Sequence, residues 1–488
     1  MFSIAGGRRA APAAGTFCLK KGARVLAAAC AGLVVPAVSS AAEIDGAALS
    51  LWWAAPFAAL LLSIALVPLG APGFWHHHFG KVSAGWALLF FVPFAAVFGP
   101  AAAGVQLLHA LLAEYIPFIL LLTALFTVAG GIHIRGNLRG SPGLNTGILA
   151  LGAVLASIMG TTGASMLLLR PFVRANDDRR HRVHGIVFFI FIVSNAGGAL
   201  TPLGDPPLFL GFLKGVDFFW TLRHIGGQTL FVVAVLLALH YAIDRWFYRR
   251  EGVLPHDPTP DTGRLGIDGG ANLGLLAAVV GLVLMSGAWK SPVVFDVFGT
   301  PVGLPGLLRD VGLVVVALVS LAITPARVHA DNRFDWAPMT EVAKLFAGIF
   351  LTIVPVIAML RAGADGPFGA VVAAVTRADG TPHPAMYFWA TGVLSSFLDN
   401  APTYLVFFNT AGGDPAVLMT TLAPTLAAIS AGAVFMGAVT YIGNAPNLMV
   451  KAIAESRGIR MPGFFGYMGW SCAVLMPLFA LVTLIWYA

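Results

Sequence analysis

Charged residues are scarce in this chain. Asp, Glu, Lys and Arg make up 10% of its 488 residues, whereas hydrophobic residues make up 58%. A soluble domain carries about 25% charged residues, so this composition excludes an ordinary soluble protein. Apolar runs long enough to span a bilayer recur from end to end, and the length accommodates about ten or more of them. The composition therefore predicts an all-α polytopic membrane protein.

Cysteine is also scarce, and no catalytic arrangement stands out. The three cysteines, Cys18, Cys30 and Cys472, have the spacing of neither a metal site nor a disulfide framework. A run of three histidines at 76–78 cannot direct every ring to one ion, so we expect it in an interfacial loop. No His/Asp/Ser ordering and no metal motif lies in a shared cavity-forming region. The sequence therefore predicts neither an enzyme nor a bound cofactor.

Positive charge is in modest excess, with 29 basic residues against 22 acidic ones. The basic residues collect in short loops between apolar runs, as cytoplasmic loops do under the positive-inside rule. This distribution indicates contact with a lipid bilayer and not with nucleic acid. We expect a multi-pass protein of a bacterial-type cytoplasmic (inner) membrane.

The first 42 residues resemble a secretory signal. Five basic residues between Arg8 and Arg24 precede an apolar stretch at 25–38, and small residues follow at 39–42. We expect this segment to be removed, and the alternative is an uncleaved first helix.

The charges of the loops predict where the first half, residues 50–250, crosses the membrane. Spans are expected at 51–69, 83–99, 115–133, 185–214 and 225–243. The stretch 147–169 has basic residues at both ends, so a simple crossing would leave one basic cluster outside. A re-entrant hairpin removes this conflict. Its tip at 159–165, MGTTGAS, is small and hydroxyl-rich, which suits irregular backbone lining a cavity.

A polar, proline-rich linker at 251–268 leads to the second half, 269–488, which repeats this plan. Spans are expected at 270–288, 311–325, 340–360, 416–450 and 465–487, with a hairpin at 385–408. Each half then holds about five crossings and one hairpin. Because five is odd, we expect two inverted repeats. Paired interruptions in inverted halves typically mark a binding site near the bilayer midplane.

The stretch 194–212, SNAGGALTPLGDPPLFLGF, places Asp205 and three prolines within an apolar run. Proline removes a backbone donor and glycine loosens the chain, so we expect a helix broken into two halves. A carboxylate deep in a membrane costs about 2.5–3.5 kcal/mol and normally has a function or a partner. The alternative is that Asp205 caps the half-helix that starts with Pro206, and both roles are compatible. Asn195 and Thr201 add oxygens, although Thr201 can instead bond its own backbone.

The second half offers a matching set of oxygen-bearing side chains. Its hairpin is interrupted at 398–403 and its long stretch at 441–447, where GNAPNL follows the pattern of GDPPL at 204–208. We expect a central site made of Asp205, Asp399, Thr161, Thr162, Ser165, Asn195, Thr201, Asn400, Thr403, Asn444 and Asn447. Oxygen ligands suit a hard cation, so Na⁺ is expected near the two aspartates. Glu114, Glu341, Lys344 and Arg170 lie near span ends, where we expect snorkelling or positioning.

These motifs resemble those of the ion transporter superfamily, which includes NhaD-type sodium/proton antiporters, citrate and dicarboxylate carriers, and arsenite pumps. The resemblance rests on NAGG at 195–198 with TPLGD at 201–205, on DNAPT at 399–403 and on GNAPN at 443–447. It covers roughly residues 50–487. It implies two inverted repeats, a homodimer with scaffold and transport parts, and alternating access by an elevator-like motion.

The motif details separate members of this superfamily. Dicarboxylate carriers typically have Ser-Asn-Thr at the hairpin tips and Gly-Thr at the break, and this chain departs from that pattern. Gly204-Asp205 resembles the NhaD-type antiporters, although prolines follow where hydroxyl residues are expected. We therefore expect a Na⁺/H⁺ antiporter in which Asp205 and Asp399 exchange the coupling ions.

The alternative is a cation-coupled carrier of citrate or another small organic anion, in which the same aspartates bind the coupling ion. An arsenite-type anion carrier and a channel are less favoured. A channel does not need paired re-entrant hairpins in inverted halves.

Overall fold

The computed structural model describes residues 45–136, 138–252 and 265–488. The predicted signal segment at 1–42 and most of the predicted linker lie outside the described residues. Nine helices in the described part of the chain are long and apolar enough to cross a membrane. Two further helices that meet at 43° make a tenth span if they are taken together. The chain is thus a multi-pass membrane protein, as predicted.

Proline begins many of the helices in the first half, because the first turn has no helical partner for its N–H groups. After two short 3₁₀ turns, η1 (Gly46–Ala48) and η2 (Leu51–Ala54), the elements are α2 (Ala55–Gly70), α3 (Pro72–Phe98), α4 (Pro100–His109), the π-helix η3 (Ala110–Tyr115), α5 (Ile116–Gly130), β1 (His133–Arg135), α6 (Pro142–Met159), α7 (Thr161–Arg174), α8 (Val183–Ile192), η4 (Ala196–Leu200), α9 (Pro206–Leu213) and α10 (Trp220–Glu251).

The second half contains further helices, one complete β ribbon formed by β3 and β4, and the strand β2, which pairs with β1 of the first half. Its elements are β2 (Gly266–Asp268), α11 (Ala271–Ala288), β3 (Val294–Val297), β4 (Thr300–Gly303), α12 (Leu304–Ile323), α13 (Ala326–Asp331), α14 (Ala337–Thr352), α15 (Val354–Arg361), η5 (Gly363–Asp365), α16 (Gly369–Ala374), α17 (Pro384–Phe397), α18 (Asn400–Thr410), α19 (Pro415–Met419), α20 (Ala423–Met436), η6 (Gly437–Val439), α21 (Ala445–Ser456) and α22 (Phe464–Trp486). The bent pair is α14 and α15.

Two local expectations need correction, and one strand pairing was not predicted. The histidines at 76–78 lie within α3 and not in a loop, because a single residue separates α2 from α3. The first hairpin tip is irregular only at Gly160, whose φ of 81° suits glycine, and helix resumes at Thr161. The end of the predicted linker is not irregular: β2 pairs antiparallel with β1, with Ile267 opposite Ile134.

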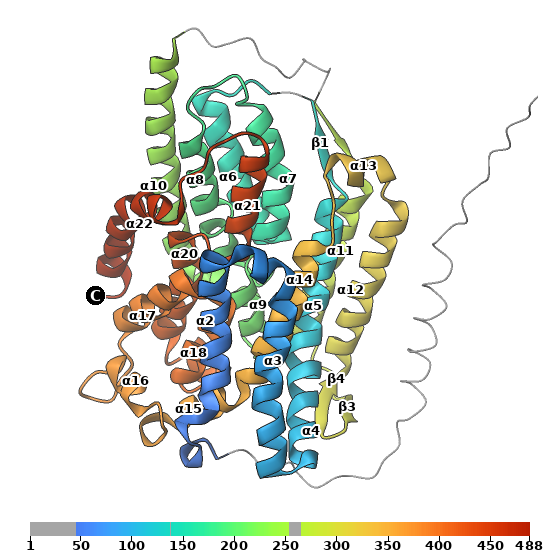
Figure 1. Ribbon diagram of the computed structural model, residues 1–488, viewed down its shortest axis with the longest axis vertical. Coiled ribbons are helices and arrows are strands. Elements are labelled where there is room, and N and C mark those ends of the chain that lie inside the picture. Colours follow the sequence, from blue (N-terminus) through green and yellow to red (C-terminus); the bar gives the residue numbers. More distant parts are fainter. Residues whose placement is uncertain (1–44, 137, 253–264) are drawn as a thin grey trace, which may run out of the picture.

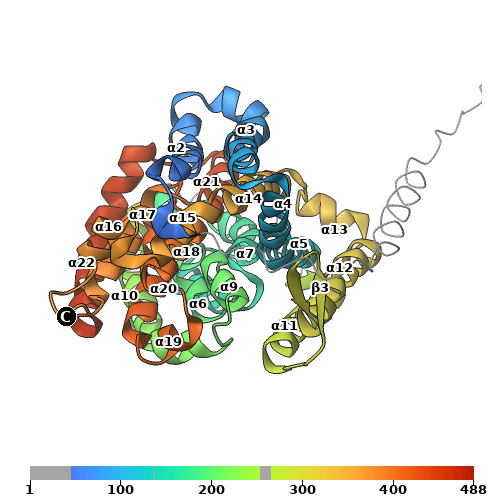
Figure 2. The same cartoon turned by 90° about the horizontal axis from the view of Figure 1, so that it is seen from below.

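The helices form two groups. Helices α6–α10 and α17–α22 pack mainly on one another, and we call them the core bundle. Helices α2–α5 and α11–α15 lie along it, and we call them the flanking helices. Figure 2 shows α11 and α12 on one side of α5 and most of the core bundle on the other. In Figure 1 the core bundle holds both hairpins, α6–α7 and α17–α18, with their tips near mid-height.

A buried ion-pair network joins the loop after α7 to α6, α8 and α10. Arg179 donates from Nη1 to Asp244 Oδ1 at 2.6 Å and from Nε to Glu251 Oε2 at 3.0 Å. His184 Nε2 lies 2.8 Å from the same Oδ1, and Asn145 Nδ2 donates to Oδ2 at 2.9 Å. All five side chains are buried. Removing one partner of such a network leaves the other charge buried and unpaired.

Replacing the central guanidinium should therefore destabilise the fold. We expect Arg179→Met to lower the free energy of unfolding by about 3–5 kcal/mol, measured by chemical denaturation in detergent micelles. The matched control is Arg223→Met. Arg223 pairs with Asp217 at 3.8 Å, with side chains 67% and 55% exposed, so its loss should cost less than about 1 kcal/mol. An equal loss in both variants would contradict the assignment.

Candidate functional site

Two interrupted helices meet inside the core bundle, and both have the same local form. A non-helical stretch at 201–205 separates η4 from α9, and another at 440–444 separates η6 from α21; the first and last residues of each are extended. Thr201 Oγ1 donates to the Ser157 carbonyl at the end of α6. Thr440 Oγ1 donates in the same way to the Ser396 carbonyl at the end of α17. Each interruption is thus fixed to the first arm of the hairpin in its own half.

Side-chain amides join the two interruptions to each other. Asn195 Nδ2 donates to Asn447 Oδ1 at 2.8 Å, and Asn444 Nδ2 donates to Asn195 Oδ1 at 3.2 Å. Asn447 Nδ2 also donates to the backbone carbonyls of Gly437 and Thr440. An amide carries donors and acceptors, so it can satisfy unwound backbone where water is absent. All three asparagines are buried.

Asp205 stands at the N-cap position of α9, yet its side chain forms no capping hydrogen bond. Its carboxylate instead accepts hydrogen bonds from Thr161 at 3.1 Å, from Asn444 at 3.1 Å and from Asn400. These donors come from the first hairpin tip, the second interruption and the second hairpin tip. The side chain is 1% exposed. One buried carboxylate therefore contacts both hairpins and both interruptions.

Asn400 has an acceptor that no other group uses. Its Nδ2 donates to Asp205, whereas its Oδ1 is buried and has no hydrogen-bond partner in the described part of the chain. Leaving a buried acceptor unpaired is costly, so it calls for a ligand. An amide oxygen beside a carboxylate is a ligand pair that a hard cation takes. Of the predicted residues, Asp205, Asn400 and Thr161 are the ones placed to hold such an ion.

Asp399 is placed differently from Asp205. Its Oδ1 accepts a hydrogen bond from the Ala401 backbone N–H at 3.1 Å, so it caps α18. Its side chain forms no hydrogen bond to Asp205, although the two carboxylates are close enough to repel each other. The capping role that was an alternative for Asp205 is thus performed by Asp399.

Most of the remaining predicted residues form hydrogen bonds to the backbone or to other side chains. Thr162 lines the cavity described below. Ser165 Oγ lies 3.0 Å from Ser194 Oγ, and Thr403 Oγ1 donates to the Asp399 carbonyl at 2.9 Å. Thr201 fixes its own interruption. Within the described residues, Ser165, Thr201 and Thr403 form no hydrogen bond to the Asp205 carboxylate.

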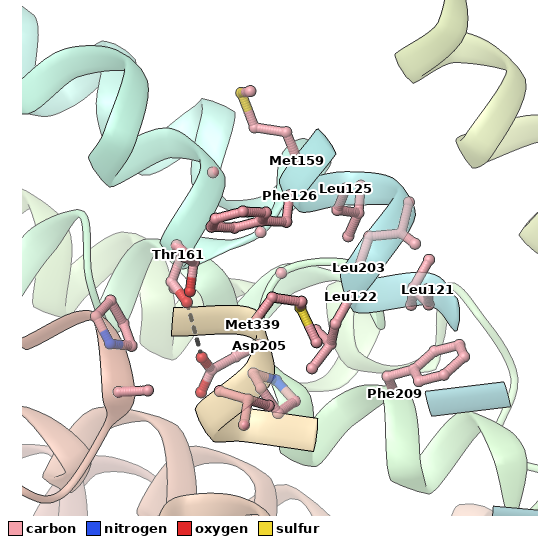
Figure 3. Close-up of a pocket in the computed structure, with 18 of the residues that line it drawn as sticks. Leu121, Leu122, Leu125, Phe126, Met159, Thr161, Leu203, Asp205, Phe209 and Met339 are labelled. Carbon is pink, nitrogen blue, oxygen red and sulfur yellow. Dashed lines mark hydrogen bonds between the residues drawn. The ribbon is translucent and has the colours of Figure 1, made fainter. Parts of the chain in front are cut away.

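A cavity of about 100 Å³ opens beside Asp205, between the core bundle and the flanking helices (Figure 3). On the core side it is lined by the first hairpin tip and the first interruption. On the flanking side it is lined by Leu121, Leu125 and Phe126 of α5 and by Met339 of α14. We call this contact between the two groups the seam. None of the residues lining the cavity is Arg, Lys or His.

A second polar cluster has the residue types of a metal site. His184, His240 and Asp244 each offer one ligand atom, and these atoms lie within 4.8 Å of one another. The Asp244 carboxylate is already paired with Arg179 at 2.6 Å and with Asn145. We therefore assign this cluster to the structural network.

Some residues that position the site were not identified from the sequence. Ser157 and Ser396 accept the threonine hydrogen bonds that fix the interruptions. The available signal was the repeated spacing Thr-x-x-Gly, which occurs at Thr201–Gly204 and again at Thr440–Gly443. Arg170 was expected to snorkel at a span end, but the structure buries it.

Comparison with known proteins supports a transport role. The chain matches none of the curated proteins. A family model described as putative citrate transport matches residues 46–487, which include both hairpins and both interruptions. The chain therefore belongs to the putative citrate transport family, a family of secondary transporters in the ion transporter superfamily.

Proposed function

We propose that this protein carries citrate, or a related small organic anion, across a bacterial-type cytoplasmic membrane and couples its movement to that of a cation. The observation that carries the coupling is the buried carboxylate of Asp205, which the tips of both hairpins contact. The family match over residues 46–487 supports the cargo. The proposed cargo, citrate or a related anion, is the alternative that the sequence motifs left open. The proposed cation site, at Asp205, is a site that the motifs favoured.

The coupling cation in this proposal is Na⁺, H⁺ or both, held at Asp205. The carboxylate, the unused Asn400 Oδ1 and the Thr161 hydroxyl provide an oxygen-only ligand set. Such ligands suit Na⁺, and the same carboxylate accepts a proton. No cofactor takes part.

Electrostatics explains why the cation would be required for cargo binding. Two like unit charges 4 Å apart repel by about 4 kcal/mol at an effective dielectric constant of 20. A bare Asp205 would therefore repel the carboxylates of citrate. A bound cation cancels this repulsion, so the anion binds well only after the cation.

The proposal includes two inverted repeats that alternate access by an elevator-like movement of the core bundle along the flanking helices. The similar construction of the two interruptions supports it. So does the apolar lining of the seam at α5 and α14, because apolar side chains can slide without breaking hydrogen bonds. As in the superfamily, we expect a homodimer.

Na⁺/H⁺ antiport is a second candidate, and one observation favours it. No basic side chain lines the cavity beside Asp205, so the cavity itself offers an anion no countercharge. In an antiporter the same carboxylate would exchange Na⁺ for H⁺ with no cargo anion.

Transport by purified protein in liposomes separates the two candidates. We expect labelled citrate to enter, and its uptake to rise with an inward Na⁺ or H⁺ gradient. Internal pH is followed in parallel with and without citrate. Na⁺-driven proton movement without citrate, combined with no citrate uptake, would replace our proposal by the antiporter.

Asp205→Asn tests the cation site, because it removes the charge with little change in size. We expect an apparent affinity for the coupling cation about 10- to 100-fold lower, which corresponds to losing one charged contact. The matched control is Asp365→Asn, an exposed residue of η5, which should leave cation dependence unchanged. Normal cation dependence in Asp205→Asn would contradict its assigned role.

Asp399 gives a separate test, because the capping role and an ion-binding role predict different results. Serine also caps helices, so Asp399→Ser should keep both stability and cation dependence. Asp399→Ala should lose about 0.5–2 kcal/mol of stability, measured by denaturation, and still respond to the cation. If Asp399→Ser folds normally but loses cation dependence, Asp399 is an ion ligand after all.

A further inference from the structure

Arg170 is a buried residue whose charge has no partner among the described residues. It lies on α7, its residue is only 9% exposed, and its Nη1 is among the buried atoms with no hydrogen-bond partner. It forms no hydrogen bond or ion pair with any residue in the described part of the chain. Burying an unpaired charge is among the most costly arrangements in a protein, so such a group normally meets an anion.

Its charged neighbours make the position still more electropositive. The guanidinium groups of Arg174, Arg333 and Arg457 are close enough to repel that of Arg170. Arg174 donates from Nη2 to the Ile134 carbonyl of β1 at 2.7 Å, and its Nε is buried without a partner. Arg333 and Arg457 are exposed. We call these four residues the arginine cluster.

The arginine cluster draws on both parts of the molecule. Arg170, Arg174 and Arg457 belong to or follow helices of the core bundle, whereas Arg333 follows α13 of the flanking helices. Asp177 and Asp331 lie near Arg174. Four guanidinium groups against two carboxylates leave an excess of positive charge. In Figure 1 the surrounding elements β1, α13 and the end of α7 lie at the top.

One face of α7 connects the arginine cluster to the Asp205 cavity. Thr162, Met166, Arg170 and Arg174 follow one another at intervals of four residues, so they lie along the same side of the helix. Thr162 lines the cavity. Met166 packs with Phe126 and Met339, which line the same cavity. This line of residues therefore runs along the seam, from the cation site at Asp205 to the end of α7 near the exposed Arg333 and Arg457.

We propose that Arg170, with Arg174, Arg333 and Arg457 at its rim, binds a carboxylate group of the cargo at this end of the seam. This inference rests on the proposed function. It assigns the anion site that the cavity beside Asp205 does not contain. Guanidinium groups present a planar fork that matches a carboxylate with two parallel hydrogen bonds, so a small polycarboxylate such as citrate fits the cluster. The cargo reaches Arg170 when α7 moves against the flanking helices.

The test compares citrate binding by the full-length protein in nanodiscs with that of Arg170→Gln. We expect the citrate affinity to fall about 10- to 100-fold, with an equal rise in the citrate KM of transport and an unchanged cation affinity. Arg249→Gln removes the same charge from the exposed end of α10 and should change neither value. Without citrate, Arg170→Gln should melt at the same temperature as the wild type or higher, because a buried unpaired charge is lost.

Two further variants test the inference even if Arg170→Gln does not fold. Arg333→Gln and Arg457→Gln alter exposed side chains, and each should raise the citrate KM a few-fold at low salt. This effect should shrink at high salt, because exposed charges are screened.

The remaining outcomes decide against the inference. If wild-type protein transports citrate and the arginine variants bind it normally, the inference fails and the proposed function stands. Inorganic phosphate, and nanodiscs with and without phosphatidylglycerol, serve as competing probes. Stabilisation by phosphate or by the anionic lipid through Arg170, but not by citrate, would overturn the inference. If the wild type neither binds nor transports citrate, both proposals fail.

Discussion

The arrangement of the core bundle depends on the hydrogen bonds around one buried carboxylate. Asp205 can remain inside the protein only while donors surround it, because an unpaired buried charge costs several kcal/mol. Those donors come from two hairpins that are far apart in the sequence, through Thr161 and Asn400, and from the second interruption, through Asn444. A displacement of either hairpin tip removes a donor. Under the proposed function, the carboxylate therefore links the positions of both hairpins to the occupancy of the cation site.

The interactions within the core bundle differ in kind from those around the cavity in the seam. Inside the bundle, amides and hydroxyls form directional hydrogen bonds between the interruptions and the hairpin arms. At the cavity, the seam is formed by apolar side chains of α5 and α14, such as Leu125 and Met339. Directional bonds fix relative positions, whereas apolar contacts permit several. This contrast supports the proposed movement of the core bundle as a unit.

Much of the fold followed from local sequence features. Glycine and proline set the interruptions, which lie at 201–205 and 440–444, and basic flanks indicated the first hairpin. These features act through backbone geometry and loop charge, which a sequence displays directly. The partners of each carboxylate depend on tertiary contacts. Both Asp205 and Asp399 precede a half-helix, so their different roles could not be separated before the hairpin tips were placed.

The burial of Arg170 is another feature that could not be predicted from the sequence. A basic residue near a span end usually reaches toward water, and sequence alone cannot distinguish this from burial between two packed groups of helices. The four short strands also escaped prediction, because each has only three or four residues. The single-residue turn at Gly160 was read as a longer irregular tip, since Thr161 and Thr162 are residues common in loops as well as in helices.

The joint between the two interruptions consists of Asn195, Asn444 and Asn447, which are all neutral amides. Amides neither gain nor lose a proton in the range of pH that cells experience. Acidification on either side of the membrane therefore leaves this joint intact. Among the described residues at the centre of the molecule, a response to acidity must therefore pass through the aspartates, while the three amides that join the interruptions keep their charge state.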